Sequence, residues 1–439
     1  MKPWRIFFVF AASLICLSRG LPQQNSDAQI LPDDFGAMAF SHIVYMAGLG
    51  HRHAGTENDQ LAIRYIKNQF DRMGVEADIE PFEFGSFEYK KATLVIGKTS
   101  FHLSGLGFNP ANIRKEYEGS PLLIDLGKRE FPYTPQEAEG RTIITNDWNG
   151  HFRLLRYNPG LIIYLDPLEF EKIRLGPDLH YKLSLEGGWR TYRSANIVAR
   201  VGQDTSCSKE IIISAHFDTY RRNNPGASDN ASGVGVLLEL ARYFKAKESE
   251  LNCVVKFVAF GAEEIGLTGS RHYLHDNSSS LQNCELMFNI DNVGGNASVV
   301  LEIDGGVSGI PEIKGSSQIP DNLKTCSWEG IDSKWRLVMN GDLRKIMGVS
   351  NHPQWLVDVV TKTVEGLGYS FETAQNMGSD QLVFAQAGIA ACGLSIGSQE
   401  GHTPYDVPEK INKTSLKAAG EIAAHIVLNT LNRFKSRYS

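Results

Sequence analysis

The sequence lacks several features that would point to other classes of protein. No C-x-x-C pair occurs among its six cysteines, so these are poor candidates for zinc ligands. Its 44 basic residues are outnumbered by 50 acidic ones, so it has no basic excess of the kind that marks a nucleic-acid surface. Beyond residue 20 no stretch approaches the 18 apolar residues that a membrane-spanning helix needs. We therefore expect a globular protein that binds neither nucleic acid nor membrane once its leader is removed.

The first 20 residues have the pattern of a cleaved signal peptide. Lys2 and Arg5 precede an apolar run at 6–17, and residues 18–20 place small side chains where a signal peptidase reads them. An uncleaved membrane anchor is the alternative interpretation. Cleavage lowers the basic count from 44 to 41 against 50 acidic residues, so the net charge falls from −6 to −9. The leader predicts a secreted protein, or a periplasmic one if the source is bacterial.

Five cysteines remain after the leader, which takes Cys16 with it. They are scattered through the chain at Cys207, Cys253, Cys284, Cys326 and Cys392. In an oxidising compartment one or two disulfides can form, with at least one thiol left over. The sequence alone does not give the pairing.

The amino-acid composition changes several times along the first half of the chain. Residues 21–35 are polar and contain proline, which indicates a leader or linker. Apolar residues at helical spacing predict a helix over 57–74, followed by an extended region at about 76–105. Residues 106–190 are rich in glycine, proline and aromatic residues with short strand-like runs, which predicts a small β-rich insertion.

From about residue 193 apolar strands alternate with helices. The expected strands are Ile211–Ser214, Val254–Phe260, Leu286–Ile290 and Ile389–Ile396. The expected helices lie at about 230–247, 266–275, 352–367 and 413–434. This alternation predicts an α/β fold in which helices sandwich a mainly parallel sheet.

Acidic residues and histidines follow each of these strands. In open α/β sheets the sites lie at the carboxyl ends of the strands, so these side chains should meet at one edge. The residues concerned are His216, Asp218, Asp229, Glu263, Glu264, Asp291 and His402. Taken singly, Asp229 could be a helix N-cap and His216 a hydrogen-bonded core histidine. Their joint placement is what indicates a site.

Crowded carboxylates repel each other unless a cation neutralises them. Two histidines with three carboxylates form a familiar set of ligands for zinc, which accepts nitrogen and oxygen donors. Two zinc ions can share one bridging carboxylate. The sequence therefore predicts a metal centre at this edge of the sheet.

Five motifs in this part of the chain resemble the M28 family of co-catalytic zinc exopeptidases. They are the segments 214–219 (SAHFDT), 226–233 (GASDNASG), 260–271 (FGAEEIGLTGSR), 289–291 (NID) and 401–404 (GHTP). The resemblance covers roughly 36–95 and 193–435, in the family's order and spacing. The insertion at 106–190 loosely resembles the protease-associated domain of some members.

The resemblance implies a role for each site residue. Asp229 would bridge two Zn²⁺ ions, with Glu264 and His402 completing one site and His216 and Asp291 completing the other. Glu263 would be the general base, and Asp218 would orient His216. Gln381 stands where relatives often have histidine, which puts the preferred substrate side chain in doubt.

The resemblance also implies an organisation and an activity. Residues 36–105 would be the N-terminal part of the peptidase domain and 191–439 its catalytic part. The substrates would be peptides, most simply cleaved from the amino terminus because carboxylates around the metals can hold a substrate ammonium. A carboxypeptidase or dipeptidase, a glutaminyl cyclase on the same fold, and a non-catalytic binding protein are the alternatives. The oligomeric state is left open.

Overall fold

The computed structural model describes residues 29–308 and 350–438. Short gaps within these ranges fall at 102, 104, 109–114, 126–131, 147–153, 155–158, 176–178, 203–206, 208, 221–223, 376 and 399. The predicted signal peptide at 1–20 and Cys326 therefore lie outside the described residues. Within the described ranges, no helix is long and apolar enough to span a membrane.

The chain divides into two compact units. Among the described residues, unit 1 comprises 29–82, 193–308 and 350–438, and unit 2 comprises 83–192. Two strands of 21 residues, β1 (Glu76–Ile96) and β8 (Tyr181–Val201), contain the unit boundaries at 82/83 and 192/193. The predicted insertion at 106–190 falls inside unit 2, which starts earlier, within β1.

The large sheet has the strand order β15-β12-β16-β11-β9-β10-β8-β1-β2, with β4 paired to β8. Besides β1 and β8, its strands are β2 (Thr99–Phe101), β4 (Glu116–Gly119), β9 (Glu210–His216), β10 (Val254–Phe260), β11 (Cys284–Ile290), β12 (Val299–Glu302), β15 (Phe371–Ala374) and β16 (Ala391–Ser395). The four strands β16, β11, β9 and β10 pair in parallel. They are the four strands predicted from the sequence.

The sheet is mixed. The predicted parallel arrangement holds for β16, β11, β9 and β10, and the strands on either side of these four are antiparallel to them. β8 pairs antiparallel with β10, and β12 pairs antiparallel with β16. A parallel neighbour needs a long crossover, usually a helix. No helix is described between β8 and β9 or between β11 and β12, so the chain reverses direction at both places. The predicted fold class, an α/β sheet flanked by helices, is confirmed.

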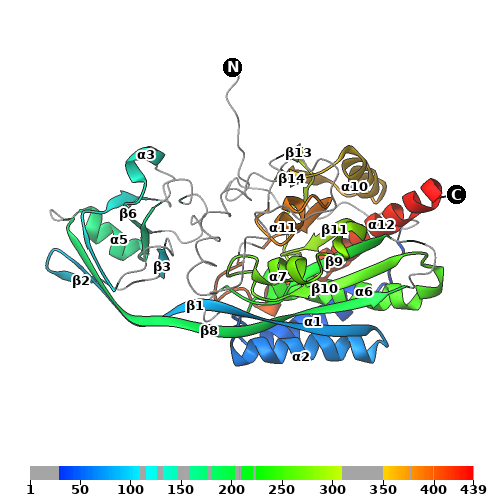
Figure 1. Cartoon of the computed structure of the whole chain (residues 1–439), viewed down its shortest axis with the longest axis horizontal. Helices are drawn as coiled ribbons and strands as arrows, with labels where there is room; N and C mark the ends of the chain where they lie inside the picture. The colour runs from blue at the N-terminus through cyan, green and yellow to red at the C-terminus, as the bar shows by residue number, and fades with distance from the viewer. Residues whose placement is uncertain are drawn as a thin grey trace, which may run out of the picture. The chain divides into compact units, whose positions relative to one another are not determined.

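Helices cover both faces of the unit 1 sheet (Figure 1). Ile211 and Ile213 of β9 contact one apolar cluster and Ile212 contacts another, because successive strand residues point to opposite faces. The first cluster includes residues of α1 (Phe35–Gly48), α2 (Glu57–Arg72), α6 (Ser232–Ala246), α10 (Gln354–Gly366) and α12 (Lys413–Tyr438). The second includes residues of α7 (Thr268–Asp276) and α11 (Gln381–Gln386). Burial of β9 from both sides explains its apolar run Ile211–Ile213.

The predicted helices of unit 1 agree with α2, α6, α7, α10 and α12 to within a few residues. Thr56 begins α2 as its N-cap by accepting a hydrogen bond from the Asp59 amide. Helix α1 was not predicted. The remaining short elements of this unit are η3 (Ala227–Ala231), η4 (Glu248–Glu250), η5 (Leu281–Asn283), η6 (Pro408–Lys410), β13 (Val307–Ser308) and β14 (Ser350–Asn351).

A disulfide joins Cys207 to Cys253 in unit 1, with the Cα atoms 5.1 Å apart. It connects the segments that lead into β9 and β10, two neighbouring strands of the sheet. Cys284 and Cys392 are buried free thiols. The pairing that the sequence left open is thereby assigned for the four described cysteines.

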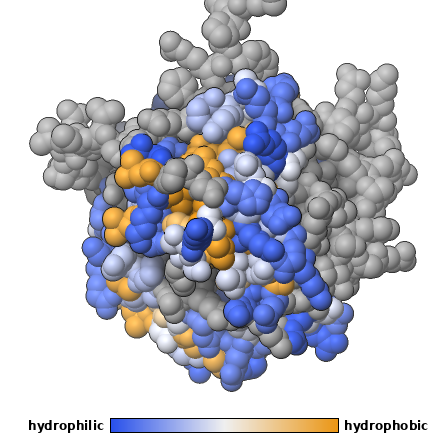
Figure 2. Space-filling view, turned by 90° about the vertical axis from the view of Figure 1, so that its left-hand side faces the viewer, coloured by the Kyte–Doolittle hydropathy of each residue, from blue (hydrophilic) through white to orange (hydrophobic). Residues whose placement is uncertain are grey.

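Unit 2 contains a four-stranded sheet of its own, in the order β3-β7-β6-β5. Its elements are β3 (Gly105–Phe108), β5 (Leu122–Ile124), β6 (Thr142–Thr145), β7 (Leu161–Tyr164), α3 (Pro135–Ala138) and α5 (Pro167–Arg174). Helix α5 buries Phe170 and Ile173 and leaves Leu168 exposed, and Leu175, which directly follows the helix, is also exposed. Figure 2 views the molecule from the left-hand side of Figure 1, and on this side apolar residues are interspersed with polar ones.

Candidate metal centre

Three parallel strands deliver the predicted ligands to one edge of the large sheet. His216 is the last residue of β9, Asp291 directly follows β11, and Glu264 lies four residues beyond the end of β10. The register places Phe260 of β10 opposite His216, so β9 and β10 end level with each other. The carboxyl ends of parallel strands share an edge, which is why residues far apart in sequence meet here.

Asp229 reaches the same edge from η3, the short π-helical segment before α6. Its backbone is not helical (φ −117°, ψ 95°), and the N-cap of α6 is Ala231. The neighbouring Asn230 side chain is buried and donates to the Ile290 carbonyl at 2.9 Å, which joins this segment to the end of β11. The alternative interpretation of Asp229 as a helix N-cap is therefore wrong.

The two carboxylate oxygens of Asp229 face two different imidazoles. Asp229 Oδ1 lies 3.3 Å from His216 Nε2, and Asp229 Oδ2 lies 3.0 Å from His402 Nε2. One carboxylate thus lies between two nitrogen ligands, with one oxygen for each. This arrangement is what a bridging ligand of two metal ions requires.

The remaining ligands divide between the two imidazoles. Asp291 Oδ1 is 3.4 Å from His216 Nε2, and Glu264 Oε2 is 3.2 Å from His402 Nε2. Potential ligand atoms lie within 4.8 Å of one another in the group of His216, Asp229 and Asp291 and in the group of Asp229, Glu264 and His402. The two groups share Asp229, and all five predicted ligands are brought together.

The electrostatics of the cluster fit a bound cation. Burial raises the pKa of Glu264 to about 7 although His402 opposes this. Burial disfavours the charged form of His216, but the neighbouring Glu263 and Asp291 carboxylates outweigh it and raise the pKa of His216 well above its usual value. Glu264 Oε1 is buried and has no hydrogen-bond partner among the described residues. The raised pKa values of Glu264 and His216 favour protonated side chains when no metal is present, and divalent cations would replace those protons.

Asp218 contacts both sides of the cluster. Its Oδ1 lies 3.5 Å from His216 Nδ1, as expected of a residue that orients this imidazole. The same carboxylate accepts hydrogen bonds from the amides of Glu263 at 2.9 Å and Glu264 at 3.2 Å. The sequence did not suggest this second contact, which fixes the turn that carries both glutamates.

Glu263 is positioned to act as a base at the cluster. It is 8% exposed, and its Oε2 lies 4.0 Å from His216 Nε2. Burial raises the pKa of Glu263 well above its usual value, and the charges of Glu264 and Asp291 act in the same direction while His216 opposes them. A raised pKa suits a group that must accept and return a proton near neutral pH.

The loops that carry the ligands contain unusual backbone conformations. Ala262, Asn292 and His402 have φ of 58°, 56° and 62°, in the left-handed region that residues with a side chain rarely adopt. Each lies at or next to a predicted ligand or base. Such conformations cost about 1–3 kcal/mol each and concentrate at functional sites.

Sequence reasoning missed three residues around the cluster. Tyr220 stacks on His402 with ring centroids 4.6 Å apart. Arg52 and Asp406 are completely buried and bind the backbone of the ligand loops. Asp406 follows His402 by four residues, and this proximity is the one signal in the sequence that pointed to it.

Gln381 lies in a buried hydrogen-bond network. It is 1% exposed, accepts from Asn289 Nδ2 at 2.9 Å and donates to Glu302 Oε2 at 2.6 Å. The Gln381 side chain is therefore held between two polar partners, Asn289 and Glu302.

Replacing Glu302 by glutamine should stabilise the protein at alkaline pH. Burial raises the pKa of Glu302 from 4.5 to about 7. The protonated Glu302 side chain contributes to the free energy of unfolding in full below pH 4.5, and this contribution is lost as the pH rises through 7. The free energy of unfolding then falls by roughly 3 kcal/mol. Glutamine is neutral, and its oxygen can accept the bonds that Met377 N and Gln381 Nε2 donate to Glu302 Oε2.

Urea unfolding between pH 4 and pH 8 measures this effect. The wild-type curve should fall more steeply with pH than that of Glu302→Gln, and the variant should be the more stable of the two at pH 8, because other buried carboxylates such as Glu264 still titrate in both proteins. Glu365→Gln, at an exposed position of α10, is the control and should follow the wild type. Equal pH dependence in Glu302→Gln and the wild type would show that Glu302 is ionised in the folded protein at neutral pH.

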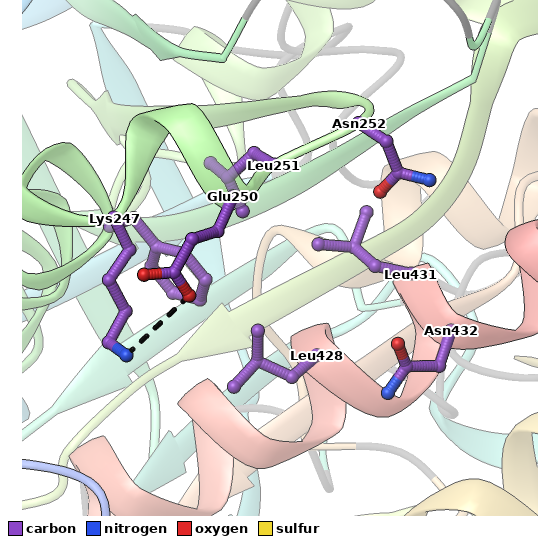
Figure 3. A pocket seen from close by; sticks show the side chains of 8 residues that line it. Lys247, Glu250, Leu251, Asn252, Leu428, Leu431 and Asn432 are labelled. Atoms are coloured by element: carbon purple, nitrogen blue, oxygen red, sulfur yellow. Dashed lines mark ion pairs between the residues drawn. The ribbon is translucent and has the colours of Figure 1, made fainter.

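A separate surface pocket of about 220 Å³ lies between η4 and α12 (Figure 3). The Lys247 and Glu250 side chains at its edge form an ion pair at 3.8 Å. Its lining consists of Phe244, Lys247, Glu250, Leu251, Asn252, Leu428, Leu431 and Asn432. It contains none of the predicted ligands, so we do not assign it to the chemistry.

Comparison with known proteins gives independent information. Residues 196–312 match the model of peptidase family M28. Aminopeptidase YwaD of Bacillus subtilis is 29% identical over 234 residues, which are 51% of this chain and 42% of the relative. The probable lipoprotein aminopeptidase LpqL of Mycobacterium tuberculosis is 27% identical over 309 residues, 62% of this chain and 61% of the relative. The chain thus spans about half the length of these two relatives.

A solved zinc aminopeptidase from Bacillus subtilis has a similar fold, with a TM-score of 0.62 and 19% identity over 92% of this chain and 96% of that one. At this level of identity the likeness concerns the fold alone. The family match over residues 196–312, the aminopeptidase relatives and the shared fold all agree with the resemblance to the M28 peptidases that the five motifs carry.

Proposed function

We propose that the chain is a zinc aminopeptidase that uses two metal ions. The observation that carries the proposal is the placement of Asp229 between His216 and His402, with one oxygen facing each imidazole at 3.3 and 3.0 Å. Nitrogen and oxygen donors in this combination suit zinc. Peptidases and zinc enzymes among the similar proteins support the same metal and reaction.

The residues of the cluster divide the work of peptide hydrolysis. Zinc bound here would supply a Lewis acid and an acidified water. Glu263 takes the proton of the attacking water at its carboxylate and returns it to the leaving amine. Asp218 holds His216 and the Glu263–Glu264 turn in place, so that the base keeps its position during both transfers.

We also propose that the protein is exported. The predicted leader at 1–20 and the Cys207–Cys253 disulfide support this, because disulfides persist in oxidising compartments. A lipoprotein aminopeptidase among the relatives is consistent with export. Purification of the protein from the culture medium or periplasm, with its N-terminus after residue 20, is the expected result. A cytosolic protein that retains residues 1–20 would contradict it.

Substrate preference tests the proposed activity directly. The chain without its leader is stripped of metal by a chelator, reloaded with zinc, and assayed on peptides that have a free, an acetylated or a cyclisable amino terminus. We expect no turnover without zinc, and cleavage of free-amino peptides only, with release of the first residue, after zinc is restored. Blocked peptides remove the ammonium that the carboxylates would hold.

Each other outcome identifies a different activity. Release of C-terminal residues would indicate a carboxypeptidase, and cleavage of dipeptides alone a dipeptidase. Cyclisation of an N-terminal glutamine without hydrolysis would indicate a glutaminyl cyclase. A protein that binds no zinc and turns over none of these peptides would be a non-catalytic binding protein.

A further inference from the structure

Asp406 binds the backbone of the segment that carries the bridging ligand. Its Oδ1 accepts a hydrogen bond from Ser228 N at 2.7 Å, and its Oδ2 accepts one from Asp229 N at 3.0 Å. Its own carbonyl oxygen accepts from Ala227 N at 3.1 Å. Asp406 is fully buried and lies on the loop that also carries His402. It therefore fastens the loop of one metal ligand to the loop of another.

Arg52 binds the same region from the other side through carbonyl oxygens. Its guanidinium donates to Phe217 O at 2.9 Å, Pro225 O at 2.6 Å and Gly226 O at 2.9 Å. Arg52 is fully buried; burial lowers the pKa of its guanidinium to about 10, and the negative charges of Asp406, Asp218 and Asp229 oppose this. A buried guanidinium that satisfies its donors with carbonyls fixes the backbone at Phe217 and at Pro225–Gly226.

The packing around Gly226 shows how closely this segment is held. A Cβ added there would lie 2.4 Å from Thr219 Cγ2, 2.6 Å from Asp229 O and 2.9 Å from Arg52 Nη2. Gly226 also has a φ of 61°, which favours glycine. The backbone before Asp229 therefore has no room to shift sideways.

We propose that Asp406 and Arg52 are positioning residues that hold segment 226–229 so that both oxygens of Asp229 face the two imidazoles before any metal binds. Neither residue is a metal ligand, since both act through backbone groups of the ligand loops. The inference rests on the zinc centre proposed above. The chain would thus prearrange the bridging carboxylate and need no cation to order it.

Asp406→Asn tests the proposal with a change of few atoms. Asparagine has only one acceptor oxygen, so its NH₂ group would face one of the two backbone N–H donors, and that donor would lose its hydrogen bond. We expect zinc affinity, measured by competition with a chelator, to fall about 10- to 100-fold at both sites, the usual effect of removing a group that supports a ligand. Turnover should be low at limiting zinc and recover toward the wild type when zinc is in excess.

Glu421→Gln is the matched control. Glu421 is 1% exposed and likewise accepts two consecutive amides, from Ile30 at 3.1 Å and Leu31 at 3.0 Å, but it contacts no ligand loop. We expect it to lower the melting temperature while leaving zinc affinity within twofold of the wild type. Wild-type affinity in Asp406→Asn, or an equal loss in Glu421→Gln, would overturn the proposal.

Hydrogen exchange of the unaltered protein gives a test that does not depend on a variant folding. In the metal-free protein we expect the amides of Ser228 and Asp229 to exchange at least about 100-fold more slowly than in an unstructured chain. Protection that arises only after zinc is added would mean that the metal orders the segment, contrary to the proposal. A protein that binds no zinc but protects these amides would refute the zinc centre alone.

Discussion

Glu263→Gln is expected to lower kcat by about 100- to 10,000-fold while both zinc ions remain bound. The amide that replaces the carboxylate cannot accept the proton of the attacking water. The contacts that position this turn are made by the backbone amides of Glu263 and Glu264 to Asp218, so the substitution leaves them intact. Turnover of a free-amino peptide, measured beside zinc content on the same sample, separates lost chemistry from lost metal.

Glu239→Gln is the control for this experiment. Glu239 is also a buried carboxylate beside an imidazole, with its Oε1 2.9 Å from His42 Nε2, but it lies on α6 and contacts none of the ligands. It should retain wild-type turnover. A Glu263→Gln protein that keeps more than a tenth of the wild-type rate would show that another group acts as the base.

Asp229→Ala is expected to weaken both metal sites together. Its two oxygens face His216 and His402, so truncation removes one oxygen ligand from each site. The loss of zinc affinity at each site should exceed the roughly 100-fold upper range for removal of a supporting group. Activity should fall below detection at ordinary zinc concentrations, and calorimetric zinc titration measures the two affinities.

Asp291→Ala provides the contrast that makes this result specific. Asp291 contacts His216 at 3.4 Å and belongs to one ligand group alone. It should therefore weaken one site and spare the other. If Asp229→Ala also left one site with wild-type affinity, Asp229 would not be a bridge.

The site could be predicted from the sequence because it is built at strand ends. Each buried strand is built mainly of apolar residues, and polar residues at or just beyond its carboxyl end mark the edge of the sheet. His216, Glu263, Glu264 and Asp291 were found in this way. The same reasoning included Asp229 and His402, and the resemblance to a family then assigned the roles of all these residues.

The residues that support the ligands could not be found by the same reasoning. Arg52 and Asp406 act by hydrogen bonds to main-chain groups, which every residue possesses. These contacts therefore cannot be predicted from a pattern of side chains in the sequence. The contacts of Gln381, which is buried against Asn289 and Glu302, were likewise not evident from the sequence.

Helices were predicted correctly where one face is apolar and the other is polar. Helix α2 buries Ile63, Ile66 and Phe70 at helical spacing beneath a charged outer face, and its limits were predicted to within two residues. Helix α1 packs one face against α6 and α12, but its exposed face carries the apolar residues Met38, Val44 and Tyr45, so no polar stripe marks the period. The antiparallel strands β8 and β12 were missed because strand direction depends on connections, which local patterns do not encode.

Anomalous diffraction at the zinc absorption edge tests the central claim most directly. Crystals of the zinc-loaded protein should give two peaks of comparable height, one on each side of the Asp229 carboxylate. The first should lie among Asp229, His216 and Asp291, and the second among Asp229, Glu264 and His402. A single peak at fully loaded stoichiometry, or two peaks that do not share Asp229, would contradict the account.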